Sequence, residues 1–202
     1  MRNDQHRTRF HFQPPKYWMN DPNGLIHWNG EYHLFYQHNP GGALWGNMHW
    51  GHAVSKDLYH WEHLPVALSP TPGGCDAMGI FSGCAVDNGG EPTLMYTGVA
   101  PEVQCIATGD PTMRNFEKYP GNPVIAHPPE DMAVTGFRDP CVWREDDGWR
   151  CVIGSGIAGK GGAALLYGSQ DLRTWDYLHP LLIGKESENG AMWECPDFFP
   201  SD

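Results

Sequence analysis

The sequence predicts an all-β fold built from repeated units, and three observations point to it. Glycine and proline contribute 25 and 18 of the 202 residues, a share that is typical of turn-rich β proteins rather than helical bundles. Short apolar and β-branched runs alternate with turn residues, and no segment of ten or more residues shows the 3.6-residue helical period. A ten-residue pattern also recurs along the chain, which indicates structural repeats.

The strand pairs follow from turn residues between apolar runs. Residues 25–28 and 32–37 flank Asn29-Gly30, a dipeptide that strongly favours a tight β-hairpin turn. Residues 93–97 follow the turn residues at 88–90. Further along, residues 141–143 and 149–153 flank Asp147-Gly148. Short antiparallel strands joined by tight turns are therefore expected throughout the chain.

The repeated pattern is S-x-D-L-x-x-W-[ED]-x-L. It occurs at 55–64 and 169–178, with a weaker copy around Asp110 and Phe116-Glu117, which gives a period of about 57 residues. A second series, at residues 21–22, 81–83, 138–140 and 194–196, shares this spacing. A repeat of this length with about four strands is typical of a β-propeller blade. The alternative is chance similarity within a β-sandwich, and two independent series with one period argue against it.

The units start near residues 21, 82, 138 and 194. The chain thus holds about three propeller blades and the first strand of a fourth. Because propellers close with roughly 4–8 blades, we expect residues 1–202 to be an N-terminal portion of a longer protein.

Composition narrows the range of partners. With 13 basic and 24 acidic residues the net charge is −11, which disfavours nucleic acid and anionic membranes as partners. No apolar run approaches the roughly 18 residues of a membrane helix. An acidic chain with nine tryptophans suits a neutral sugar, whose ring faces stack on aromatics and whose hydroxyls bind carboxylates. No signal peptide is evident at the start, and both an extracellular and a cytoplasmic location remain open.

No metal or other cofactor is expected. The six cysteines form no C-x-x-C pair, which disfavours a zinc ribbon or a thioredoxin motif. His49 and His52, like His60 and His63, would share a face only in a helix, whereas these segments are predicted as strand and loop. The glycine-rich stretches 154–156 and 159–162 lack the spacing of a phosphate-binding loop.

Candidate catalytic groups follow from the repeat. In a propeller the first strand of each blade lines the central channel, so residues at equivalent starts converge at one mouth. This places Asp21, Ser82, Arg138, Asp139 and Glu194 around a common funnel. Neighbouring carboxylates raise one another's pKa, so one can serve as acid/base while another stays ionised. Hydrolysis of a glycosidic bond requires such a pair.

Seven short motifs occur along the chain in a fixed order. Three are signature-like boxes: Trp-Met-Asn-Asp-Pro-Asn-Gly at 18–24, Arg-Asp-Pro at 138–140 and Trp-Glu-Cys-Pro at 193–196. The other four are Phe-Tyr-Gln at 35–37, Trp-Gly-Asn at 45–47, Trp-Gly-His-Ala at 50–53 and Phe-Ser-Gly at 81–83. In type and order the seven motifs resemble those of the β-fructofuranosidases, the invertases and fructanases of glycoside hydrolase family 32.

The resemblance implies a five-bladed β-propeller followed by a C-terminal β-sandwich, which would lie outside residues 1–202. It also implies retaining hydrolysis of terminal β-D-fructofuranosyl residues from sucrose or short fructans. Asp21 matches the nucleophile, Glu194 the general acid/base, and Asp139 the residue that binds fructose hydroxyls and stabilises the transition state. Retention requires the reacting carboxyls to lie about 5–5.5 Å apart. Residues 1–202 alone are expected to be inactive, because the channel wall beside Glu194 would be incomplete.

The resemblance further implies a set of substrate-binding residues. Amide side chains can bind sugar hydroxyls and aromatic rings can wall off the sugar, although packing between blades is the alternative role of the aromatics. Cys195 would be a small neutral neighbour of the acid. The set comprises Trp18, Asn20, Gln37, Trp45, Phe81, Ser82 and Arg138.

Other functions remain open. A fructosyltransferase would use a sugar acceptor in place of water on the same scaffold. An inverting, arabinan-directed propeller would place its carboxyls about 6.5–9.5 Å apart. A non-catalytic sugar-binding propeller is a third possibility, although all three carboxylates are present.

Overall fold

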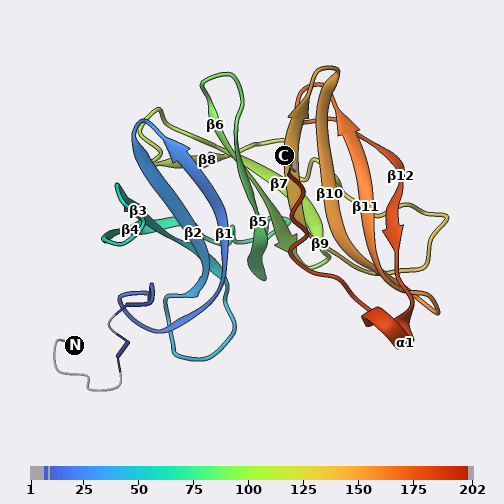
Figure 1. Ribbon diagram of the computed structural model, residues 1–202, viewed down its shortest axis with the longest axis horizontal. Helices are drawn as coiled ribbons and strands as arrows, with labels where there is room; N and C mark the ends of the chain where they lie inside the picture. Colours follow the sequence, from blue (N-terminus) through green and yellow to red (C-terminus); the bar gives the residue numbers. More distant parts are fainter. Residues whose placement is uncertain (1–6, 9, 200–202) are drawn as a thin grey trace.

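The computed structural model describes residues 7, 8 and 10–199, and three four-stranded antiparallel sheets make up almost all of it (Figure 1). In each sheet the strands are ordered as they follow in the chain. The predicted all-β fold is thereby confirmed. The strands are β1 (Trp18–Trp28), β2 (Glu31–Asn39), β3 (His49–Ser55), β4 (Trp61–Leu68), β5 (Gly79–Asp87), β6 (Pro92–Val99), β7 (Val103–Gly109), β8 (Phe116–Lys118), β9 (Val134–Glu145), β10 (Gly148–Ile157), β11 (Gly161–Ser169) and β12 (Trp175–Ile183).

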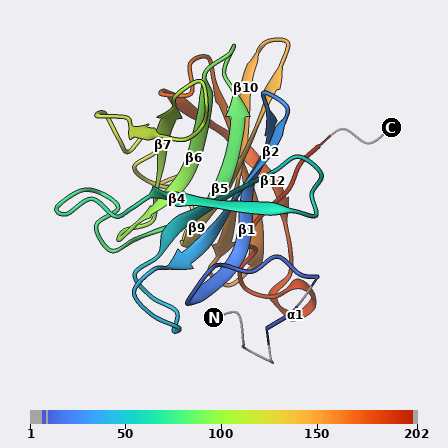
Figure 2. The ribbon, with the colours of Figure 1, turned by 90° about the vertical axis from the view of Figure 1, so that its left-hand side faces the viewer.

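The first strands of the three sheets lie next to one another. Strand β5 contacts both β1 and β9, while β4 and β12 lie at the outer edges (Figures 1 and 2). Sheets that meander outward from a shared set of inner strands are the blades of a β-propeller. The propeller prediction is therefore confirmed, with three blades present. The C-terminal β-sandwich stays a prediction.

The hairpin between β1 and β2 forms at the predicted Asn29-Gly30 turn. Both residues have positive φ angles, 49° and 81°, as a type I′ turn requires. Its twist matches that of the flanking strands, so Trp28 pairs directly with Glu31. The turn thereby fixes the register that carries Asp21 to the other end of β1.

The repeated sequence pattern forms a turn between the third and fourth strands of a blade. In the first blade, Ser55 Oγ accepts the N–H groups of Asp57 (3.2 Å) and Leu58 (2.8 Å). The indole N–H of Trp61 donates to the carbonyl of Leu58 (3.0 Å). Leu58 has a φ of 65°, and this left-handed residue reverses the chain into β4.

The other two blades contain counterparts of this turn. Residues 169–175 repeat the three hydrogen bonds at 3.2, 3.0 and 3.0 Å, and Leu172 has a φ of 64°. In the middle blade Asp110 takes the place of the serine and caps the N–H of Thr112, while Met113 has a φ of 52°. The period therefore reflects one turn geometry used three times.

Apolar side chains fill the space between adjacent blades in two clusters. One joins the first and second blades around Trp50, Ile80 and Tyr96, which are all fully buried, and the other joins the second and third blades around Phe137 and Leu165. Every residue of β6 is buried, as expected for a middle strand covered on both faces. Burial of these apolar clusters stabilises the packing of neighbouring blades and so keeps their inner strands adjacent at the channel.

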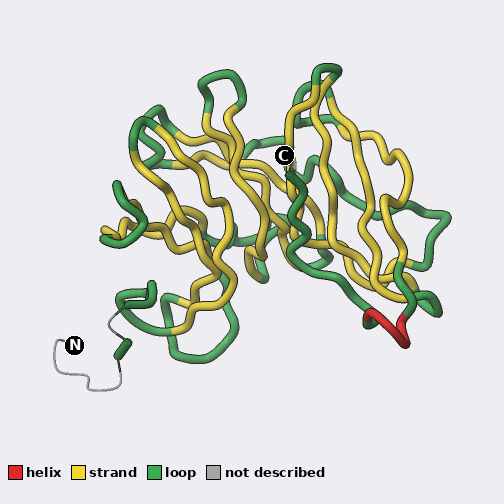
Figure 3. The backbone as a smooth tube through the Cα atoms, in the orientation of Figure 1, coloured by secondary structure: helices red, strands yellow, loops and turns green. Residues whose placement is uncertain are grey.

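The strand expected to begin a fourth unit at Glu194 is not formed. After α1 (Glu186–Asn189) the chain runs back beside β9 and β10 (Figure 3). A strand needs a continuous ladder of hydrogen bonds with a neighbour. Here the backbone makes isolated bonds, such as that from Trp193 N–H to the carbonyl of Ser155 (3.1 Å), so residues 190–199 stay irregular. The four-residue α1 is the only helix of the described part of the chain, and it is too short to cross a membrane.

Candidate active site

A cavity of about 210 Å³ opens where the three inner strands begin, and nine of the ten predicted site residues line it. They come from β1, β2, β5, β9, the loop after β2 and the segment after α1. Asn20, near the start of the described chain, and Glu194, near its end, thus share one pocket. The lining residues are Asn20, Asp21, Gln37, Trp45, Phe81, Ser82, Arg138, Asp139 and Glu194.

Asp21 is held by a side chain of the neighbouring blade. Ser82 Oγ donates to Asp21 Oδ2 over 3.0 Å, and Asn23 Nδ2 donates to the same serine oxygen over 3.4 Å. Ser82 is 2% exposed, so this bond is shielded from water. The orientation of the Asp21 carboxylate therefore depends on how β1 packs against β5.

Asp139 is the most buried of the three carboxylates, at 5% exposure. Its φ of 61° lies in the left-handed region, which aspartate tolerates better than most residues. Its N–H donates to Thr97 Oγ1 over 3.0 Å, and its Oδ2 accepts the N–H of Cys195 over 2.9 Å. Burial raises the pKa of Asp139 to about 6, although the Cys195 N–H and the nearby Arg138 charge oppose the shift.

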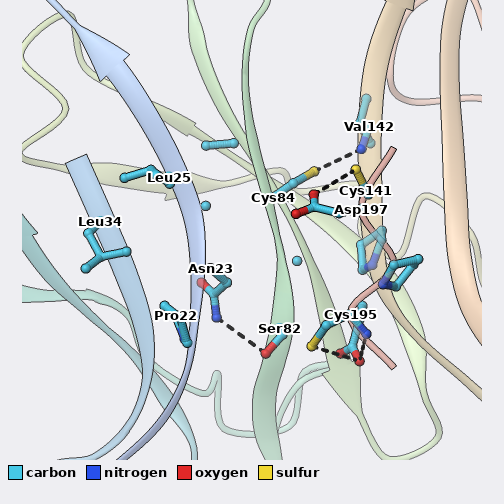
Figure 4. Close-up of a pocket in the computed structure, with 16 residues that line it drawn as sticks. Pro22, Asn23, Leu25, Leu34, Ser82, Cys84, Cys141, Val142, Cys195 and Asp197 are labelled. Carbon is cyan, nitrogen blue, oxygen red and sulfur yellow. Dashed lines mark hydrogen bonds between the residues drawn. The ribbon is translucent and has the colours of Figure 1, made fainter. Parts of the chain in front are cut away.

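Cys195 connects the two aspartates. Its sulfur lies 3.6 Å from Oδ2 of Asp21 and 3.6 Å from Oδ2 of Asp139. Burial and the two carboxylates raise the thiol pKa far above its usual value. The thiol therefore stays protonated at neutral pH and can only donate to these carboxylates. Figure 4 shows Cys195 opposite Ser82 of β5.

Glu194 is paired with Arg138. Its Oε1 accepts from Arg138 Nη2 (2.6 Å) and Nε (3.1 Å), while Arg138 Nη1 donates to Glu102 (2.9 Å). Burial alone would lower the pKa of Arg138, but the hydrogen bond to Glu194 and the Glu102 charge outweigh it and raise the pKa. The Glu194 side chain is 60% exposed and so remains open to a bound ligand.

Glycines of the third blade let the segment that carries Glu194 pack closely against that blade. A Cβ on Gly162 would lie 2.2 Å from Cδ1 of Trp193, and a Cβ on Gly154 would lie 2.5 Å from the Trp193 carbonyl oxygen. Trp193 is further fixed by its indole N–H, which donates to the carbonyl of Asn189 (3.0 Å). Any larger residue at these glycines would push Trp193, and Glu194 with it, outward.

The remaining predicted residues line or support the pocket. The Gln37 amide donates to the carbonyl of Ile80 (2.9 Å), and the rings of Trp45 and Phe81 lie 6.1 Å apart at the rim. Trp45 is 60% exposed, which leaves its face free for a ligand. Trp18 is the one predicted residue that does not line the cavity.

The indole N–H of Trp18 instead donates to Asn20 Oδ1 over 2.7 Å. Trp18 therefore positions the side chain of Asn20, which lines the pocket. In this position it holds the amide group of a pocket residue and does not itself face the cavity.

A second cavity, of about 500 Å³, continues along the inner strands (Figure 4). Ser82, Asp139 and Cys195 border it, and Ser82 and Asp139 also line the first cavity. The candidate site therefore lies at the mouth of the central channel.

None of the histidines in the described part of the chain lines this pocket. His33 Nδ1 and His52 Nε2 are 3.0 Å apart inside the first blade, and burial lowers the pKa of His52 to about 3. His52 stacks on Phe35, with ring centres 4.3 Å apart. Among residues 7, 8 and 10–199, no group of three or more His, Cys, Asp and Glu side chains comes together to hold a metal ion.

A family model for the "Glycosyl hydrolases family 32 N-terminal domain" matches residues 11–202. The chain belongs to glycosyl hydrolase family 32. Raffinose invertase of Escherichia coli is 47% identical over 201 residues, which cover 94% of this chain and 40% of that protein. The chain therefore spans about 40% of the length of this relative.

Solved structures of family 32 members share the fold. The β-fructofuranosidase of Bombyx mori is 44% identical, with a TM-score of 0.85 over 96% of this chain and 42% of its own. Fructan 1-exohydrolase IIa of Cichorium intybus is 42% identical, with the same TM-score over 95% of this chain and 37% of its own. At these identities the three blades correspond to part of a family 32 enzyme fold.

Three supporting residues of this family 32 site were not predicted. Glu102, Thr97 and Gln104 belong to the second blade and hold residues 137–139 of the third. None of them lies in a motif or a repeat position, so the sequence alone carries no signal for them. Their role becomes visible only once the blades are packed.

Proposed function

We propose that this chain carries the fructose-binding and catalytic groups of a retaining β-fructofuranosidase that acts on sucrose or short fructans. One observation carries the proposal: a single pocket gathers Asp21, Asp139 and Glu194, with the acid paired to Arg138 and the aspartates bridged by Cys195. Two carboxyl groups with distinct surroundings are what glycoside hydrolysis requires. The names of the relatives, an invertase and a fructan exohydrolase among them, support the same class of substrate.

In the first step Asp21 attacks C2 of the fructosyl unit. Ser82 and Cys195 both bind Asp21 Oδ2, which leaves Oδ1 to form the new bond. The bond from C2 to the leaving oxygen breaks, and Glu194 gives that oxygen its proton. Arg138 binds only Oε1 of Glu194, so Oε2 is the oxygen available to carry the proton.

In the second step water releases the sugar. Ionised Glu194 takes a proton from water, whose oxygen attacks C2 as the C2–Asp21 bond breaks, which restores both carboxyl groups. Two displacements at one carbon retain its configuration. Ionised Asp139 faces the positive charge that develops on the sugar ring in both transition states and stabilises it.

The test is hydrolysis of sucrose by the full-length protein and by Asp21→Asn and Glu194→Gln variants. We expect the parent to release β-fructofuranose first, seen by NMR before the anomers equilibrate, and each variant to lose at least about 10³-fold in kcat. Glu188→Gln, on the exposed α1, is the matched control and should keep full activity.

Three outcomes would contradict the proposal. Release of the inverted anomer would exclude a double displacement at Asp21. Unchanged activity in either variant would remove that carboxylate from the mechanism. Fructo-oligosaccharides as the main product at high sucrose would instead assign the chain to the fructosyltransferases.

A further inference from the structure

Glu102 uses both of its carboxylate oxygens on the third blade. It lies in the turn between β6 and β7 of the second blade. Its Oε1 accepts from Arg138 Nη1 over 2.9 Å, and its Oε2 accepts the backbone N–H of Phe137 over 2.6 Å. Charge-assisted bonds of this kind are roughly twice as strong as neutral ones. Glu102 thus holds two consecutive residues of β9 from the neighbouring blade.

The Arg138 guanidinium is shared between two carboxylates. Nη1 points to Glu102, while Nε and Nη2 both reach Oε1 of Glu194. The absence of a side chain at Gly136 makes room, because a Cβ there would lie 2.9 Å from Arg138 Nη1. One positive charge is therefore divided between Glu194 and a carboxylate outside the pocket lining.

The backbone around Arg138 is fixed by the same blade. Gln104 Nε2 donates to the carbonyl of Phe137 over 2.8 Å, and Gln104 Oε1 accepts from Thr97 Oγ1 over 2.8 Å. Thr97 Oγ1 in turn accepts the N–H of Asp139. Thr97 and Gln104 are fully buried. Because Gln104 and Thr97 also hold this backbone, loss of the Glu102 charge should affect mainly the Arg138 side chain.

We propose that Glu102 is a positioning residue for the acid/base step, because it holds Arg138 on the side away from Glu194 and takes up part of its charge. Glu102 does not line the pocket and acts only through Arg138. The inference rests on the proposed function, since it assigns Glu194 the proton transfer.

The sign of the effect follows from Coulomb's law. With Glu102 neutral, its negative charge would no longer oppose ionisation of Glu194, whereas Arg138, which also faces Asp139, would still favour it. Glu194 would then lose its proton at a lower pH, and it would protonate the leaving group less effectively. A substrate with a good leaving group needs little protonation and should be less affected.

The test is Glu102→Gln in the full-length protein. We expect the basic limb of the kcat/KM profile for sucrose to move to lower pH by about 0.5–1 unit, less than the 1–3 units of a directly adjacent charge. We also expect kcat to fall about tenfold for sucrose but less than about threefold for p-nitrophenyl β-D-fructofuranoside. Glu102→Asp should restore the position of the limb in part.

Glu31→Gln is the matched control. Glu31 pairs with Arg114 over 2.8 Å at a similar exposure but lies on the first blade outside the pocket. It should leave the pH profile unchanged. If Glu102→Gln lowered kcat equally for both substrates and left the basic limb of the kcat/KM profile at its parental pH, the role of Glu102 would be merely structural and the proposal would be overturned.

A second readout does not depend on activity. Carbon-13 NMR of the Glu194 carboxyl group should show that it titrates at lower pH in Glu102→Gln than in the parent. If the parent does not hydrolyse fructosides, the proposed function fails while this titration still decides the role of Glu102. An unchanged titration would overturn the inference whatever the activity.

Discussion

Ser82 on β5 donates its hydroxyl hydrogen to Oδ2 of Asp21 on β1 over 3.0 Å. The bond joins the inner strands of two adjacent blades at the place where the proposed nucleophile lies. Asn23 Nδ2 donates to the same hydroxyl oxygen and so turns its hydrogen toward Asp21. The packing of β5 against β1 therefore also sets the orientation of the proposed nucleophile.

Replacing Ser82 by alanine tests this relationship. A hydrogen bond to a charged group is worth about 1.5–3 kcal/mol, and about 1.4 kcal/mol corresponds to a tenfold change in rate. We expect Ser82→Ala to lower kcat/KM for sucrose by about 10- to 100-fold in the full-length protein. Ser187→Ala, on the exposed α1, is the control, and equal rates in the two variants would contradict the role of Ser82.

Asp139 gives a prediction about stability. Burial raises its pKa to about 6, against about 3.9 in an unfolded chain. The folded state therefore binds the proton more tightly. The stability that this adds is complete below about pH 4 and is lost as the pH rises through about 6. Ionised Asp139 thus costs folding free energy at neutral pH.

The variant that checks this is Asp139→Asn, which cannot ionise. It should exceed the parent in free energy of unfolding by about 2–3 kcal/mol at pH 7–8, and the difference should shrink toward zero near pH 4. Urea unfolding across this range measures it. A pH-independent difference for Asp139→Asn would contradict the account.

Gly162 gives a prediction about the position of Trp193 and, through it, of Glu194. An alanine there would place its Cβ 2.2 Å from Trp193 Cδ1, and overpacking of this kind costs about 1–3 kcal/mol. We expect Gly162→Ala to lower the thermal midpoint, change tryptophan fluorescence and reduce sucrose turnover, because Trp193 carries Glu194 with it. Gly42→Ala, where the nearest atom would be 3.8 Å away, is the matched control. A Gly162→Ala variant with parental fluorescence and turnover would show that the close approach is unimportant.

The repeats were predictable because each depends on local chemistry. A serine or aspartate cap and a left-handed residue precede the aromatic residue at each outer turn, and this combination leaves a readable pattern at Leu58 and Leu172. The placement of Asp21 and Asp139 in one pocket follows from the same period, because equivalent strand positions in neighbouring blades face the same channel. Glu194 reaches the pocket from an irregular segment instead.

Other features depend on contacts between blades and were not predictable. Glu102 looks like any exposed turn carboxylate until the third blade brings Arg138 beside it. Trp18 belongs to a signature-like motif, yet whether its indole faces a sugar or Asn20 depends on a side-chain rotation that no spacing encodes. Likewise, a strand at Glu194 depends on a pairing partner and not on its own residues.

The most direct test of the central claim is to trap the fructosyl enzyme. In full-length Glu194→Gln, p-nitrophenyl β-D-fructofuranoside can react without protonation of its leaving group, whereas the second step lacks its base. Peptide mass spectrometry of the quenched reaction should then find one hexosyl unit on the peptide that contains Asp21, and fragmentation should place it on the Asp21 side chain. A hexosyl unit on Asp139 or on any other residue, or none despite a burst of nitrophenol, would contradict the account.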